Sequence, residues 1–97
     1  MYAVIFTATM RELDEEYSTT AERMRSLAFS KYGCKEFTSC TEDNQEIAIS
    51  YWESEQQIID WKNDPEHQAA QKLGIQRWYK SYKVQIVELL REYESST

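Results

Sequence analysis

Residues Tyr51 to Tyr82 read YWESEQQIIDWKNDPEHQAAQKLGIQRWYKSY, and this stretch decides the fold. An aromatic pair ends a predicted strand, and Ser54 then starts a helix with Gln57 three residues on, which is the spacing of a capping box. Asp64 and Pro65 start a second helix, because aspartate accepts hydrogen bonds from free backbone N–H groups and proline suits the first helical position. The stretch therefore predicts a strand followed by two short helices.

The same stretch holds all three tryptophans and the only histidine of the chain, which are Trp52, Trp61, Trp78 and His67. Large aromatic side chains supply apolar surface, and an imidazole exchanges protons near neutral pH. This concentration predicts a pocket for a small molecule. It does not identify the reaction.

Hydrophobic patterning predicts further elements before this stretch. Apolar residues alternate from Tyr2 to Met10, which is typical of a strand. Apolar residues at three- and four-residue spacing predict a helix from Leu13 to Lys31, ended by Gly33. Strands at Cys34 to Thr41 and Gln45 to Trp52 are expected to form a hairpin across a polar turn.

The two short helices are expected from about Glu55 to Asn63 and from Pro65 to Leu73, with Gly74 breaking the second. Alternation from Tyr82 to about Tyr93 predicts the last strand. The order is β-α-β-β-α-β, so we expect an α+β, ferredoxin-like fold with an antiparallel sheet. Residues 1–97 leave room for one domain.

The strands are apolar on both faces, which bears on the oligomeric state. Ile47, Ile49 and Tyr51 share one face of their strand, and Ala48 and Trp52 share the other. Helices cover only one face of a ferredoxin-like sheet, so the other face should carry polar residues if it meets water. Apolar residues on both faces predict a homodimer in which a second sheet covers the first, with the last strand reaching the edge of the partner.

Composition excludes several classes of partner. The formal net charge is −6 and the pI is about 4.8, and Lys and Arg form no stripe that would bind nucleic acid. The N-terminus lacks the basic region of a signal peptide, and no apolar run approaches the ~20 residues that span a bilayer, so we expect a cytoplasmic protein without membrane contact. Cys34 and Cys40 are expected to be free thiols, and no residues have zinc-ligand spacing.

The motifs WESE, WK, DPEHxAA and RWYxSY, together with the first strand and helix, resemble the antibiotic biosynthesis monooxygenase family of small dimeric α+β barrel proteins. The resemblance covers nearly the whole chain. It implies a dimeric α+β barrel and a small monooxygenase. It further implies cofactor-independent oxidation of an aromatic or polycyclic molecule.

The resemblance also suggests roles for particular residues. Trp61 matches a tryptophan that lines the substrate cavity of haem-degrading and quinone-forming relatives, although it also suits a gap between helix and sheet. Trp52 and Trp78 are expected either to bind substrate or to fill the core or a dimer contact. His67 is the candidate acid or base if it points into a crevice rather than into solvent, and Tyr82 is the candidate donor to a substrate oxyanion.

The chain departs from the haem-degrading relatives at two positions. Those relatives combine the tryptophan with an asparagine on the first strand and an axial histidine on the helix. Here the first strand offers Thr7 or Ala8, and Gln71 stands where the iron ligand is expected. His67 lies one turn earlier, so neither haem nor a metal is expected.

A second interpretation belongs to another class. The same fold supports proteins that bind a small ligand without transforming it, so a non-catalytic dimeric binding or stress-associated protein is the alternative. A pocket large enough for a ring system, with His67 facing into it, favours the enzyme. A filled core around Trp61 favours the binding protein.

Overall fold

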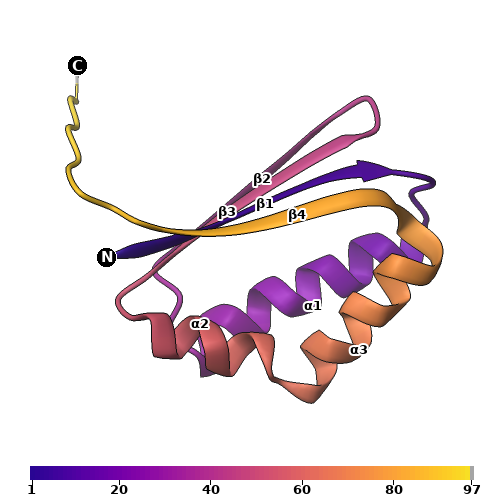
Figure 1. Cartoon of the computed structure of the whole chain (residues 1–97), viewed down its shortest axis with the longest axis horizontal. Coiled ribbons are helices and arrows are strands. Elements are labelled where there is room, and N and C mark those ends of the chain that lie inside the picture. Colours follow the sequence, from indigo (N-terminus) through magenta and orange to yellow (C-terminus); the bar gives the residue numbers. More distant parts are fainter. Residues whose placement is uncertain (97) are drawn as a thin grey trace.

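Four antiparallel strands form one sheet, and the helices lie on one of its faces (Figure 1). The computed structural model describes residues 1–96. The strands and helices run in the order β1 (Tyr2–Met10), α1 (Glu15–Lys31), β2 (Glu36–Glu42), β3 (Gln45–Trp52), α2 (Glu55–Lys62), α3 (Pro65–Leu73) and β4 (Tyr79–Glu88). The strand order across the sheet is β2-β3-β1-β4, which confirms the ferredoxin-like α+β fold.

The two faces of the sheet follow from the pairing of its strands. β1 lies between β3 and β4, with Val4 opposite Ser50 and Ile86. Val4 packs against residues of α1 and α2, so it and every second residue of β1 face the helices. Ile5 and its partner Ile49 face the other way, toward the side that no helix covers.

The predicted helix caps are present. The Ser54 hydroxyl accepts from the Gln57 N–H at 3.3 Å, and the Gln57 side chain accepts in return from the Ser54 N–H, which completes the capping box. Asp64 accepts from the Glu66 N–H at 2.8 Å at the start of α3. The first helix begins at Glu15 rather than Leu13, because Asp14 is its N-cap and lies in extended conformation.

The second short helix, α3, ends at Leu73 as predicted, but Gly74 does not break the helical path of the chain, and that part of the prediction is wrong. Its backbone is right-handed helical, and the chain continues through one π-helical turn, Gly74–Trp78. The glycine is needed for space instead, since a Cβ there would lie 2.4 Å from the ring of Tyr79. β4 begins at Tyr79, directly after the π turn.

Two strands differ in extent from the prediction. β4 begins three residues earlier than Tyr82 and ends at Glu88 rather than near Tyr93. The residues after β4 turn away from the helices toward the open side of the sheet (Figure 1). β2 begins at Glu36, because Cys34 still belongs to the connection from α1 and its N–H donates to the Ala28 carbonyl. Cys34 is buried and Cys40 exposed, and both are free thiols as predicted.

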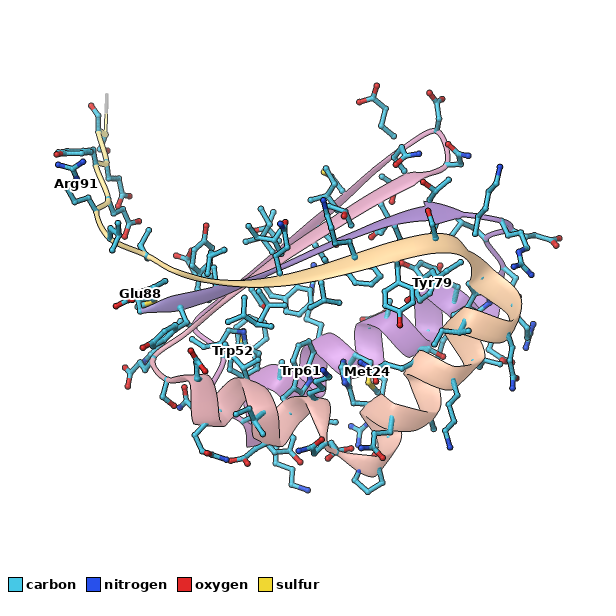
Figure 2. The ribbon with its side chains drawn as sticks, viewed as in Figure 1. Met24, Trp52, Trp61, Tyr79, Glu88 and Arg91 are labelled. Atoms are coloured by element: carbon cyan, nitrogen blue, oxygen red, sulfur yellow. The ribbon has the colours of Figure 1, made fainter. Side chains whose placement is uncertain are left out.

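The core lies between the sheet and the helices, as Figure 2 shows for Trp52, Trp61 and Met24. It consists of two groups of buried residues. One gathers around Trp52 and Trp61, and the other around Trp78 with Ala8 and Met10. Within residues 1–96, no helix has both the length and the apolar character needed to cross a membrane.

Candidate functional site

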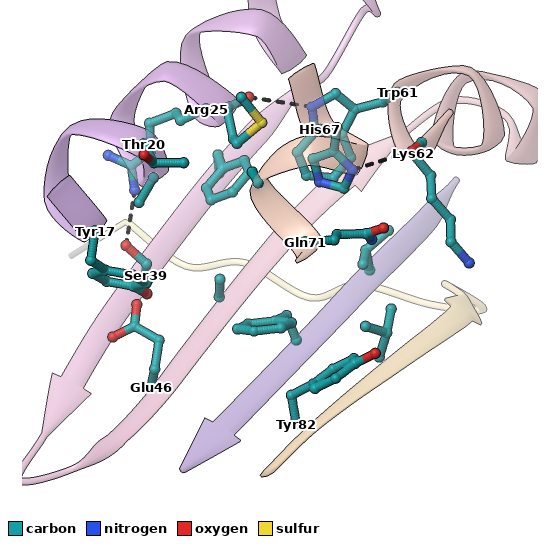
Figure 3. Close-up of a pocket in the computed structure, with 18 of the residues that line it drawn as sticks. Tyr17, Thr20, Arg25, Ser39, Glu46, Trp61, Lys62, His67, Gln71 and Tyr82 are labelled. Carbon is teal, nitrogen blue, oxygen red and sulfur yellow. Dashed lines mark hydrogen bonds between the residues drawn. The ribbon is translucent and has the colours of Figure 1, made fainter. Parts of the chain in front are cut away.

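A cavity of about 590 Å³ lies between the helix-facing side of the sheet and helices α1, α2 and α3 (Figure 3). This volume falls in the range of about 300–1,000 Å³ that is usual for small-molecule sites. Its walls are mainly apolar and come from all three helices and all four strands. The apolar lining includes Val4, Phe6, Met24, Ile58, Val84 and Ile86.

Trp61 forms part of the cavity wall and part of the core at once. Only 7% of the residue is exposed, and its indole N–H donates to the Met24 carbonyl at 3.3 Å. Its ring lies 4.3 Å from the imidazole of His67 and 5.1 Å from the indole of Trp52, centroid to centroid. The sequence offered wall and core as alternatives, and the structure combines them.

His67 lines the cavity beside Trp61, at the start of α3. Burial lowers the pKa of His67 below its usual value. The contact with the Lys62 carbonyl and the charge of Asp64 act in the opposite direction, but their effect is smaller. The imidazole is therefore neutral at pH 7. Its Nδ1 lies 3.4 Å from the Lys62 carbonyl oxygen, which only accepts, so this contact assigns the hydrogen to Nδ1 and leaves Nε2 as an acceptor.

Tyr82 lies on β4 with half of its surface exposed, and it also lines the cavity. Its ring stacks on that of Phe6 at 6.3 Å and lies tilted against that of Tyr79 at 5.6 Å, centroid to centroid. Burial raises the pKa of Tyr79 to about 12, with smaller effects from Glu46 and Tyr82. The Tyr79 phenol is therefore protonated at neutral pH and able to donate a hydrogen bond.

The other two tryptophans have different positions. Trp78 lines the cavity, donates its indole N–H to Asp14 at 3.1 Å and meets the edge of Tyr17. Trp52 is fully buried, donates to the Ser50 hydroxyl at 2.8 Å and is not among the lining residues. The structure thus brings Trp61, Trp78, His67 and Tyr82 to one cavity and places Trp52 in the core behind Trp61, so of the positions that the sequence left open for Trp52 it takes the core and not the cavity wall.

Glu46 is a cavity residue that the sequence analysis missed. It is 7% exposed, and the Thr41 hydroxyl donates to its carboxylate. Tyr17 lies beside it (Figure 3), and the pKa of Tyr17 is raised by burial and further by the charge of Glu46. The sequence pattern could have predicted this position. Side chains alternate between the two faces of a strand, so Glu46 shares the helix-facing side of β3 with Ala48 and Trp52.

Three ion pairs tie the elements around the cavity together. The Arg77 guanidinium lies 2.8 Å from a carboxylate oxygen of Asp14 and 2.8 Å from one of Glu16, so it fastens the π turn to the start of α1. Arg23 of α1 makes two hydrogen bonds to Glu66 of α3, at 2.8 and 2.9 Å. Arg77 therefore meets two carboxylates.

Residues 1–73 match the profile that defines the family described as antibiotic biosynthesis monooxygenase. The chain belongs to this family. The protein YqjZ of Bacillus subtilis, strain 168, is 42% identical over 92 residues, which cover 94% of this chain and 81% of YqjZ. Family membership confirms the resemblance found in the sequence.

Solved structures of other proteins share the fold. SnoaB from Streptomyces nogalater, described as a cofactor-independent oxygenase, superimposes with a TM-score of 0.81 at 11% identity, over 97% of each chain. Rv0793 from Mycobacterium tuberculosis gives a TM-score of 0.81 at 12% identity, over 96% of this chain and 98% of that one. At these identities the similarity shows the fold alone.

The cavity does not fit a haem. Gln71, at the expected ligand position, offers an amide in place of an imidazole. His67 lies against the indole of Trp61 at 4.3 Å, so a flat macrocycle has no room between the two rings. Within the described part of the chain, no three His, Cys, Asp or Glu side chains gather as metal ligands.

Proposed function

We propose that this protein is a monooxygenase that encloses a flat aromatic molecule in the cavity and oxidises it with O₂, using electrons from the substrate itself. The observation that carries the proposal is a cavity of about 590 Å³ with Trp61 in its wall and His67 beside it. Family membership and the shared fold with the cofactor-independent oxygenase SnoaB support the same reaction class.

The reaction balances without a further reductant. A ring carbon loses a proton, and the resulting carbanion transfers electrons to O₂ and forms a C–O bond. The hydroperoxide then loses water as its O–O bond breaks, so CH₂ and O₂ become C=O and H₂O. A neutral His67 accepts or returns the protons at Nε2, and Tyr82 donates a hydrogen bond to the substrate oxyanion. Trp61 and Trp78 enclose the rings.

A homodimer is part of the same proposal. The helix-free face of the sheet carries Ile5, Ile49, Tyr51 and Val87, and Leu90 and Tyr93 of the tail lie against the same side. Leu90 is 84% exposed and Tyr93 87% exposed. A second copy that covers this face removes these apolar side chains from water.

Oxygen uptake in the presence of hydroxylated naphthalenes and anthracenes tests the function. We expect saturable O₂ consumption with a stoichiometry of one O₂ per quinone formed, and its loss in His67→Gln. Tight binding of the same compounds with no oxygen uptake contradicts the proposed oxidation and favours a non-catalytic binding protein.

A further inference from the structure

The cavity has a second polar end that the roles of His67 and Tyr82 do not use. Glu46 of β3 and Tyr17 of α1 lie side by side there, while His67 lies across the cavity next to Trp61 (Figure 3). A ligand held against Trp61 and extending along the apolar lining therefore meets a carboxylate at its other end.

Burial of Glu46 is unusual for a carboxylate. None of the ion pairs formed by residues 1–96 includes Glu46. Removing a carboxylate from water without a cationic partner is costly, and proteins keep such arrangements mainly at functional sites. The nearby Arg25 is engaged elsewhere, since its guanidinium donates to the Ser39 hydroxyl at 3.1 Å and lies 5.0 Å over the ring of Phe37.

The Glu46 carboxylate can also accept more hydrogen bonds than it receives within the protein. A carboxylate offers about four lone-pair sites. Thr41 donates a hydrogen bond to one oxygen of Glu46, and the Tyr17 side chain lies beside the carboxylate (Figure 3). Because Thr41 uses only one of these sites, the carboxylate keeps free sites that can accept a hydrogen bond from a donor in the cavity.

We propose that Glu46 determines ligand specificity: its carboxylate accepts a hydrogen bond from a hydroxyl or amino group of the ligand and excludes ligands that carry an anionic group at that position. This inference rests on the proposed function in one respect, namely that the ligand binds in the cavity. It does not depend on whether the ligand is then oxidised. It assigns a positioning role to a residue outside the His67 and Tyr82 pair.

Calorimetric titration with four naphthalenes that differ in one substituent tests this on the unmutated protein. The four are 2-naphthol, 2-naphthylamine, 2-methoxynaphthalene and 2-naphthoate. We expect the naphthol and the amine to bind at least ~10-fold more tightly than the methyl ether, because a hydrogen bond to a charged group is lost in the ether. The naphthoate is expected to bind most weakly. Equal affinities of all four overturn the proposal.

Glu46→Gln removes the charge and keeps the shape of the side chain. We expect it to narrow the gap between naphthol and ether and to admit the naphthoate. Glu12→Gln makes the same chemical change in the exposed connection between β1 and α1, and it should leave all four affinities unchanged. A Glu46→Gln protein that loses stability but keeps the original order of affinities shows that Glu46 is only structural and overturns the proposal.

Glu46→Asp provides a second variant in case Glu46→Gln does not fold. It withdraws the carboxylate by one methylene, so the preference for naphthol over the methyl ether should shrink, and an unchanged preference contradicts the proposal.

Oxygen uptake separates this inference from the proposed function. Selective binding without O₂ consumption contradicts the oxidation alone, whereas O₂ consumption with four equal affinities contradicts the role of Glu46 alone. If none of the four compounds binds, both the proposed oxidation and the role of Glu46 are contradicted.

Discussion

At the scale of single residues, Trp61 and Trp52 form a matched pair, because their indoles touch but only Trp61 reaches the cavity. We expect Trp61→Phe to weaken the binding of an aromatic ligand by about 0.5–1.5 kcal/mol, roughly 2–10-fold, since a wall contact is lost. Trp52→Phe leaves the Ser50 hydroxyl without its donor and should cost about 1–3 kcal/mol of stability while affinity stays the same. Urea unfolding and calorimetric titration of both variants check this, and the reverse pattern contradicts the assignment of Trp61 as a wall.

His67 is the only histidine, so its titration is directly visible by NMR. Its pKa is lowered from 6.5 in the folded protein, mainly by burial. The unfolded chain therefore binds a proton at a pH where the folded protein does not, and stability falls as pH drops below about 6.5. We expect His67→Gln to flatten this part of the stability profile. An imidazole that titrates above pH 6.5 in the folded protein contradicts the burial of His67.

Haem provides another residue-scale prediction, because Gln71 replaces the expected iron ligand. The purified protein should be colourless, and added haemin should bind weakly without a sharp Soret band. A sharp band at one equivalent that disappears in His67→Ala contradicts this. Gln71→His places an imidazole at the ligand position and should strengthen haemin binding.

At the scale of elements, capping residues in the sequence predicted where helices start, whereas tertiary packing determined features that the sequence did not reveal. Ser54 and Asp64 act as caps through neighbours three or fewer residues away, so the sequence alone located α2 and α3. Gly74 has the residue type of a helix end, yet the chain continues from it into a π turn, and the glycine is required there because the ring of Tyr79 occupies the space of a Cβ. Glu46 was missed for a similar reason, since its burial depends on α1 packing across the sheet.

Gly33 is the glycine whose backbone requires its residue type. It has a φ of 80° after α1, and a Cβ there would lie 2.7 Å from the Gln57 side chain. Gly33→Ala should therefore destabilise the protein by about 1–2 kcal/mol, because left-handed backbone is unfavourable for alanine. Chemical denaturation measures the loss. Stability equal to the unmutated protein contradicts the need for a left-handed residue at this position.

At the scale of the whole molecule, the helix-free face of the sheet predicts the dimer. Ile47 on this face is 41% exposed, and Ile59 on the outer side of α2 is 44% exposed. Because both are exposed in a single chain, neither Ile47→Lys nor Ile59→Lys should unfold it. We expect only Ile47→Lys to split the dimer in sedimentation experiments at micromolar concentration. An unmutated protein that sediments as a single 11.6 kDa chain contradicts the dimer.

The most direct test of the proposed oxidation in the cavity follows the oxygen atoms. The protein is incubated with a hydroxylated anthracene under ¹⁸O₂, and the quinone is analysed by mass spectrometry. We predict one ¹⁸O atom in each quinone, since the hydroperoxide leaves one atom on the ring and releases the other as water. The label should be lost together with quinone formation in His67→Gln. A quinone that carries no ¹⁸O, or one that forms at the same rate without the protein, contradicts the proposed function.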